Sequence, residues 1–122
     1  MTLDEALAAC PIVAILRGVR PDEILSVAEA LEGAGVRAIE VPLNSPEPLE
    51  SIRRLADWAG DRLAVGAGTV LTPDAVDAVA EAGGRIVVSP DANPAVIART
   101  VERGLDPAPG FATATEAFAA LR

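Results

Sequence analysis

One phrase repeats along this chain: a short apolar run, then an amphipathic stretch that opens with proline, then glycine. The apolar runs are continuous rather than alternating, and strands of this kind are covered on both faces, as in parallel sheets. We therefore predict five strands joined by helices. The strands are Ile12–Arg17, Ala38–Leu43, Leu63–Ala67, Ile86–Ser89 and, with the weakest pattern, Ala108–Phe111.

The helices between these runs have clear start and stop signals. Proline stands at the first position of four of them, where its missing N–H is not needed: Pro21, Pro46, Pro73 and Pro94. Three of these prolines follow a good N-cap: Ser45, Thr72 and Asn93. Glycine closes the four helices where a left-handed residue is needed: Gly35, Gly60, Gly83 or Gly84, and Gly104. A capping box of Thr113 and Glu116 opens a further helix, and a short helix at about Thr2–Ala9 precedes the first strand.

The repeat predicts an α/β fold with five parallel strands and right-handed crossovers, at roughly 20 to 25 residues per unit. No linker or low-complexity tract divides the chain, so residues 1–122 form a single domain. Two architectures fit the pattern: an open doubly wound sheet, or part of a (β/α)8 TIM barrel. A complete barrel takes about 200 residues or more, so five units would make an incomplete one.

The charge of the chain limits its partners. Its net charge is −8 and its isoelectric point is near 4.4, which disfavours nucleic acid, whose binding depends on neutralising phosphates with Lys and Arg. No apolar run approaches the roughly 20 residues of a membrane span, and the acidic start lacks the basic-then-apolar order of a secretory signal. We expect a cytoplasmic protein that binds neither nucleic acid nor membrane.

The residue types that the chain lacks limit its chemistry. Histidine is absent and Cys10 is the only cysteine, so neither a zinc site nor a Cys-His nucleophile can form, and we expect no metal. No GxGxxG fingerprint or phosphate P-loop occurs, so we expect no nucleotide cofactor. Proton transfer near neutral pH is then left to carboxylates, water or a substrate phosphate.

The strand ends contain two candidate functional side chains. Functional groups of parallel α/β folds belong at the carboxyl ends of the strands, where Arg17 ends the first run. Glu40 lies inside the second run between Ile39 and Val41. An ionised carboxylate there needs a partner or a raised pKa, which is the profile of a general base or acid. The alternative is a structural carboxylate paired with an arginine such as Arg17.

A glycine-rich turn follows the third run. Gly66 and Gly68 allow a ligand to approach the backbone, and Thr69 adds a hydroxyl. A turn between strand and helix can have these glycines without binding a ligand, so the signal is weak by itself. Ser89–Pro90 and Pro109–Gly110 occupy equivalent strand ends, as ligand sites or as tight turns.

Five segments, in order and in spacing, resemble the 2-keto-3-deoxy-6-phosphogalactonate aldolases, which are close relatives of the 2-keto-3-deoxy-6-phosphogluconate aldolases. The segments are Ile12–Gly18, Pro21–Glu23, Ile39–Pro46, Gly66–Leu71 and Pro109–Phe118. Each is modest alone, and the resemblance runs from about residue 10 to the last residue.

The resemblance implies a trimeric class I aldolase with a (β/α)8 barrel, which splits a phosphorylated keto-deoxy sugar acid into pyruvate and glyceraldehyde 3-phosphate. It implies that Glu40 is the general acid/base, that Arg17 holds the carboxylate end of the substrate, and that Thr69, beside it, helps to orient that carboxylate. Asn44 matches the galactonate branch. The reaction uses an imine as its electron sink, so no metal or other cofactor is implied.

The resemblance is incomplete in one respect that matters for catalysis. It implies a Schiff-base lysine on a sixth strand, beyond Arg122, whereas all ten positive side chains here are arginine. Arginine stays protonated and cannot form an imine. The alternatives are therefore a non-catalytic module that binds keto acids or assembles with partners, and a small βα-barrel sugar-phosphate epimerase that uses Glu40 without an imine. Asp106–Pro107 also predicts that the fifth run is a strand start or an edge strand.

Overall fold

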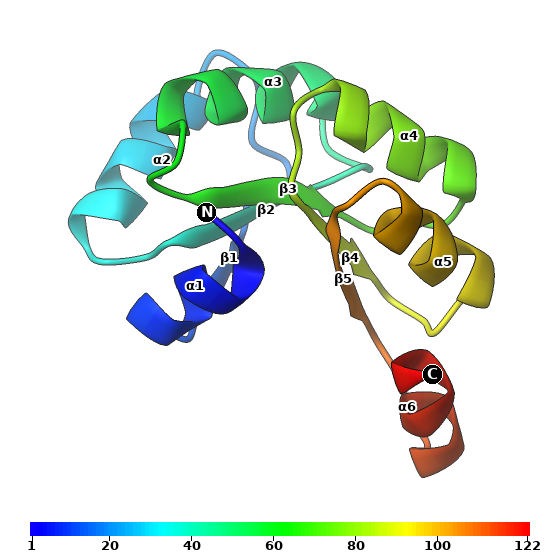
Figure 1. Ribbon diagram of the computed structural model, residues 1–122. Coiled ribbons are helices and arrows are strands. Elements are labelled where there is room, and N and C mark those ends of the chain that lie inside the picture. The colour runs from blue at the N-terminus through cyan, green and yellow to red at the C-terminus, as the bar shows by residue number, and fades with distance from the viewer.

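The computed structural model describes all 122 residues as alternating helices and strands (Figure 1). The six helices are α1 (Leu3–Ala9), α2 (Ile24–Gly33), α3 (Pro48–Ala59), α4 (Pro73–Glu81), α5 (Pro94–Glu102) and α6 (Ala114–Leu121). The five strands are β1 (Val13–Ile15), β2 (Ala38–Pro42), β3 (Ala64–Gly68), β4 (Ile86–Ser89) and β5 (Asp106–Pro109). None of these helices combines the length and the apolar character needed to cross a bilayer.

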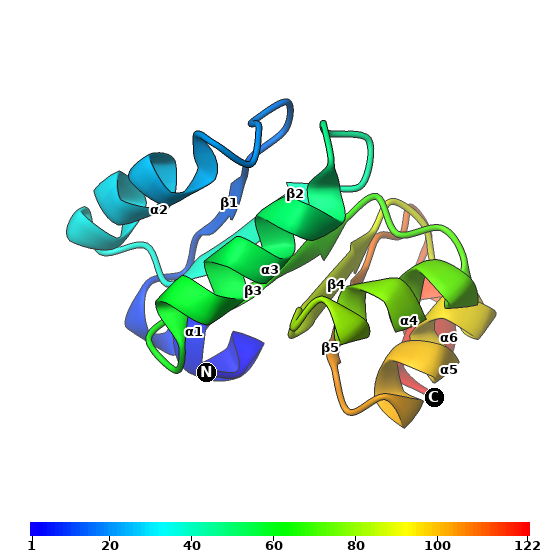
Figure 2. The same cartoon turned by 90° about the horizontal axis from the view of Figure 1, so that it is seen from above.

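The strand order identifies the architecture. All strands are parallel and lie in the order β1-β2-β3-β4-β5. Helices α2 to α5 follow one another over one face of the sheet, and α1 lies on the other side (Figures 1 and 2). A doubly wound sheet would have a reversal of strand order and helices on both faces. The structure therefore confirms the prediction of an incomplete βα barrel, whose free edges are β1 and β5.

Side chains of the strands alternate between two apolar layers. The larger layer lies between the sheet and its helices and includes Ile39, Val41 and Val65. The smaller layer faces the concave side, where Ala38, Ala64 and Ile86 pack against Ala6 of α1. Helix α1 therefore covers the amino-terminal part of the concave face and leaves the carboxyl ends of the strands open.

Two of the four proline-led helix starts are placed as predicted. Helix α4 begins at Pro73, with the Thr72 hydroxyl accepting from the Ala75 N–H at 3.1 Å. Helix α5 begins at Pro94, with the Asn93 side chain accepting from Ala95 at 3.0 Å. The predicted capping box of α6 also forms.

The other two predicted starts are wrong by two or three residues. Pro21 lies in a turn in which the Glu23 N–H donates to Arg20 O, and α2 begins only at Ile24. Pro46 precedes α3, which begins at Pro48 because Glu47 has a left-handed φ of 41°. Ser45 therefore caps no helix.

The fifth strand starts two residues earlier than predicted. Its run was expected at Ala108–Phe111, and β5 instead spans Asp106–Pro109. The Asp106 N–H donates to the Arg85 carbonyl, just before β4, and the Gly110 N–H donates to the Ser89 carbonyl at the end of β4, at 2.9 Å each. Because alternate residues of a strand bond to opposite neighbours, Pro107 and Pro109 face the free edge. Proline is thus confined to an edge strand, as predicted, and this edge presents no donor at either position.

Candidate functional site

The three predicted site residues come together at the carboxyl ends of neighbouring strands. Arg17 follows β1, Glu40 lies in β2, and Thr69 follows β3. The parallel register pairs Glu40 with Ile15 on one side and with Gly66 on the other. The Leu16 N–H donates to the Glu40 carbonyl at 3.0 Å, which fixes the backbone beside Arg17 to the strand that contains the carboxylate.

Glu40 is buried without a partner. Ile39 and Val41 point into the layer beneath the helices, so the side chain of Glu40 points to the opposite, concave face. It is only 4% exposed, its Oε2 atom has no hydrogen-bond partner, and it belongs to none of the ion pairs in the structure. The alternative of a carboxylate paired directly with Arg17 is therefore not what the structure shows.

The surroundings of Glu40 favour its protonated form. Burial raises the pKa of its carboxyl, and the positive charge of Arg17 acts in the opposite direction without cancelling the effect. A carboxyl of this kind can hold a proton and release it closer to neutral pH than an exposed glutamate can. This is the property that a general acid/base requires.

Gly68 makes room for this carboxylate. A Cβ atom at position 68 would overlap Oε2 of Glu40 and would lie 2.6 Å from Oε1. The sequence suggested that the glycines of this turn let a ligand approach the backbone, and the structure shows that Gly68 accommodates a side chain of the protein itself. Gly66 has a different function, because a Cβ there would meet the backbone of Ile86 in β4.

Arg17 and Thr69 face each other across the strand ends. The Arg17 Nη2 atom lies 3.5 Å from the Thr69 hydroxyl, at the long limit of a hydrogen bond. Arg17 is exposed and forms no ion pair, so its guanidinium is free to bind an anion. Thr69 has a φ of 55°, which is strained for a β-branched residue. Strained residues concentrate at binding and catalytic sites.

These three side chains can bind a carboxylate and move a proton. Arginine and a hydroxyl are donors suited to a carboxylate, and a nearby carboxyl with a raised pKa can exchange a proton with a ligand or with water. The structure contains no group of three His, Cys, Asp or Glu side chains arranged to hold a metal ion.

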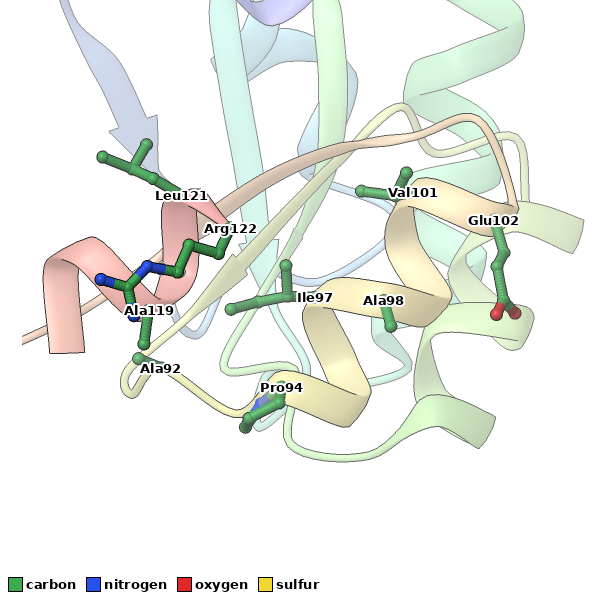
Figure 3. A pocket seen from close by; sticks show the side chains of 10 residues that line it. Ala92, Pro94, Ile97, Ala98, Val101, Glu102, Ala119, Leu121 and Arg122 are labelled. Carbon is green, nitrogen blue, oxygen red and sulfur yellow. The ribbon is translucent and has the colours of Figure 1, made fainter.

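The grooves of the surface lie away from these residues. The largest, of about 540 Å³, separates α5 from α6, and Figure 3 shows Ile97 and Val101 of α5 on one side and Leu121 of α6 on the other. None of the grooves is lined by Arg17, Glu40 or Thr69. The site instead lies on the open concave face, where no strands stand opposite.

Sequence reasoning missed one residue beside the site. Ser45 was predicted to cap a helix, and its hydroxyl instead accepts from the Gly18 N–H at 3.1 Å. The signal that could have revealed this is Pro48, because two prolines in Pro46-Glu47-Pro48 allow two helix starts, and the later one leaves the serine free. Asn44 is exposed beside it. Ser89 and Pro109 are the last residues of β4 and β5.

Comparison with known families gives one clear match. The family model described as KDPG and KHG aldolase matches residues 3–122. Among curated proteins, the chain is similar to the 2-dehydro-3-deoxy-6-phosphogalactonate aldolase of Escherichia coli K12, with 50% identity over 111 residues. That match covers 91% of this chain and 54% of the relative, so the chain spans about half the length of the curated relatives it matches.

Solved structures are similar over the same extent. A native KDPGal structure superposes with a TM-score of 0.89 at 50% identity, covering 91% of this chain and 54% of that one. The KDPG aldolase of Legionella pneumophila superposes with a TM-score of 0.86 at 28% identity, covering 95% and 56%. That structure holds pyruvate as a covalent carbinolamine intermediate. The five βα units described above therefore correspond to about half of an aldolase barrel chain.

Proposed function

Because the chain belongs to the KDPG and KHG aldolase family, we propose that its 122 residues supply the keto-acid half of a class I aldolase active site. In this proposal Arg17 and Thr69 hold the carboxylate of the keto acid, and Glu40 transfers protons. The substrate of the complete enzyme is 2-dehydro-3-deoxy-6-phosphogalactonate, which is cleaved to pyruvate and glyceraldehyde 3-phosphate. The identity to an aldolase named for that substrate favours it over the gluconate epimer.

The observation that carries the proposal is the buried, unpartnered carboxylate of Glu40 beside a free arginine. Burial of a glutamate without a hydrogen bond to Oε2 is costly, and an arginine without an ion pair is free to bind a substrate anion. The cost of burying Glu40 is recovered when a keto acid binds, because water or the substrate then satisfies Glu40 while the carboxylate of the keto acid pairs with Arg17. A purely structural site would have paired the two side chains with each other.

The proposed reaction needs an amine that these residues do not contain. An amine forms an imine with the keto carbon and the keto oxygen leaves as water. The bond between C3 and C4 then breaks, and its electron pair enters the imine to give an enamine. The proton of the C4 hydroxyl passes through water to Glu40 as the aldehyde leaves, Glu40 returns a proton to C3, and water hydrolyses the imine to release pyruvate and the free amine. Because the chain has no lysine, we propose that the amine comes from residues outside these 122.

The N-terminal amine is badly placed to replace a lysine. Met1 packs against the layer of Ala6, Ala38 and Ala64 near the amino ends of the strands, and its charge acts on Asp106 at the start of β5. The candidate site lies toward the opposite end of the same strands. This placement favours the second candidate function for the chain by itself, which is binding of a keto acid without cleavage.

We also propose that the chain associates with itself. Large apolar side chains are exposed at both free sides of the sheet: Ile12 and Ile15 at β1, and Val101, Phe111, Phe118 and Leu121 near β5. Burial of apolar surface contributes about 25 cal/mol per Å², which opposes the repulsion of eight net negative charges per chain. The trimer that the family resemblance implies is then one of several arrangements that could cover these surfaces.

Trapping with pyruvate and borohydride separates the candidate functions. We expect pyruvate to bind, with no covalent label on any side chain after reduction. A label on a side chain would contradict the assignment of the amine to residues outside the chain. Exchange of the pyruvate C3 protons without a label would support proton transfer by Glu40 without an imine, as in the epimerase alternative. Absence of any binding would contradict the keto-acid site.

A further inference from the structure

One partly buried hydrogen bond joins the loops that follow β1 and β2. The Gly18 N–H donates to the Ser45 hydroxyl at 3.1 Å, across 27 positions of the sequence. Ser45 is 7% exposed, and its own N–H donates to the Pro42 carbonyl at 2.9 Å. The serine is therefore fixed to the last residue of β2, the strand that contains Glu40.

This hydrogen bond acts on the peptide unit that follows Arg17. The Gly18 N–H and the Arg17 carbonyl belong to the same planar peptide group, so holding the N–H orients the peptide on the carboxyl side of Arg17. Gly18 has a φ of 81°, a conformation in which only glycine is unstrained. The chain turns sharply there, and small rotations of this peptide would move the guanidinium by a larger distance.

Arg17 has little else to hold it. It forms no ion pair, unlike most arginines of the chain, and its contact to Thr69 is a long one at 3.5 Å. The position of its guanidinium relative to Glu40 and Thr69 therefore depends mainly on its backbone.

We propose that Ser45 is a positioning residue for Arg17, which orients the guanidinium toward the keto-acid site through the Gly18 amide. This inference rests on the function proposed above, in which Arg17 binds the carboxylate. It assigns to Ser45 a role distinct from helix capping, and it explains why a serine hydroxyl is buried between two loops at the mouth of the site.

Two measurements on the intact chain test the proposal. The first is titration of the Glu40 carboxyl by NMR, because the charge of Arg17 lowers the pKa of Glu40 and so reports where the guanidinium lies. The second is the affinity for pyruvate, from NMR shifts. The variants are Ser45→Ala, Ser45→Thr, which keeps the hydroxyl, Arg17→Ala as reference, and Ser51→Ala as control. Ser51 is also a buried serine, at 0% exposure, and its hydroxyl has no hydrogen-bond partner.

We expect Ser45→Ala to raise the pKa of Glu40, as Arg17→Ala does. When Ser45→Ala is added to Arg17→Ala, the pKa should rise no further than in Arg17→Ala alone. Ser45→Ala should also weaken pyruvate binding roughly threefold to tenfold, the size of one lost hydrogen bond, whereas Ser45→Thr restores both readouts and Ser51→Ala changes neither. If Ser45→Ala lowers stability while the pKa of Glu40 is unchanged, the proposal is overturned, and Ser45 only stabilises the contact between the two loops. If the unsubstituted chain binds no pyruvate, the proposed function fails, and the Glu40 titration still decides the role of Ser45.

Discussion

Replacing Gly68 with alanine places a methyl group where the Glu40 carboxylate lies. The new Cβ would overlap Oε2 and would stand 2.6 Å from Oε1. Gly68 is not among the residues with positive φ, so the backbone itself accepts alanine. The clash is with the end of a flexible side chain rather than with backbone, and the carboxylate can move toward solvent to relieve it.

The expected cost follows from two opposing effects. Overpacking a tight site costs about 1–3 kcal/mol, and replacing glycine at a permissive φ recovers about 0.4–1 kcal/mol by restricting the unfolded chain. We predict that Gly68→Ala lowers the free energy of unfolding by roughly 0.5–2 kcal/mol. The displaced carboxyl is better solvated, so the pKa of Glu40 falls toward its ordinary value.

Urea unfolding followed by Trp58 fluorescence measures the stability, and NMR titration measures the pKa. In a Glu40→Ala background the clash is gone, so Gly68→Ala should be neutral or stabilising, and the double-mutant cycle gives the coupling directly. Gly33→Ala is the matched control, because Gly33 has nothing within 4 Å of an added Cβ and an ordinary φ. Equal costs of Gly68→Ala with and without Glu40 would refute the view that this glycine exists to accommodate the carboxylate.

Three further predictions concern charge and association. Folding raises the pKa of Glu40 above its ordinary value of 4.5, so the chain loses stability as pH rises from 4.5 through the pKa of the folded state. Glu40→Gln should therefore raise the free energy of unfolding at neutral pH and have little effect below pH 4.5. A pH profile of stability that is the same in both proteins would contradict this. Burial opposes ionisation of Asp106, but Arg85 and the Leu3 N–H outweigh it and lower its pKa, so Asp106→Asn should destabilise the chain by roughly 1–3 kcal/mol at neutral pH, with the difference vanishing in acid as the carboxyl protonates. Light scattering at tens of micromolar should show a dimer or a larger species, and this association should increase with salt. Ile15→Glu should reduce the association, whereas Leu25→Glu on α2 should not. A sharp monomer peak with cooperative unfolding would show that the open sheet is complete by itself.

The fold was predictable because each βα unit has its own local signals. Thr72-Pro73 and Asn93-Pro94 start helices where an N-cap and proline should, and the continuous apolar runs give strands in sequential order. The pattern could not choose between a doubly wound sheet and a partial barrel, since both alternate strand and helix. That choice depends on which face of the sheet each crossover helix covers, and the apolar face of a helix has the same sequence pattern in either case.

The place of the candidate residues in the fold was predictable from the sequence, but their contacts were not. Glu40 in an apolar strand indicates an unusual carboxylate whatever the fold, and parallel strands bring Arg17 and Thr69 to the same end of the sheet. Whether Glu40 pairs with Arg17 depends on side-chain distances that no spacing encodes. The same is true of Ser45, because a cap at Pro46 and a loop contact to Gly18 are equally compatible with its local sequence.

Titration of the ¹⁵N-labelled chain with pyruvate tests the central claim most directly. If Arg17, Glu40 and Thr69 form a keto-acid site, the amide shifts will concentrate on these residues and on Gly68, and Arg17→Ala will abolish them. Acetate, which has a carboxylate but no keto group, should bind the same residues more weakly. Shifts that appear only in the groove between α5 and α6, or no saturable shifts at all, would contradict the account.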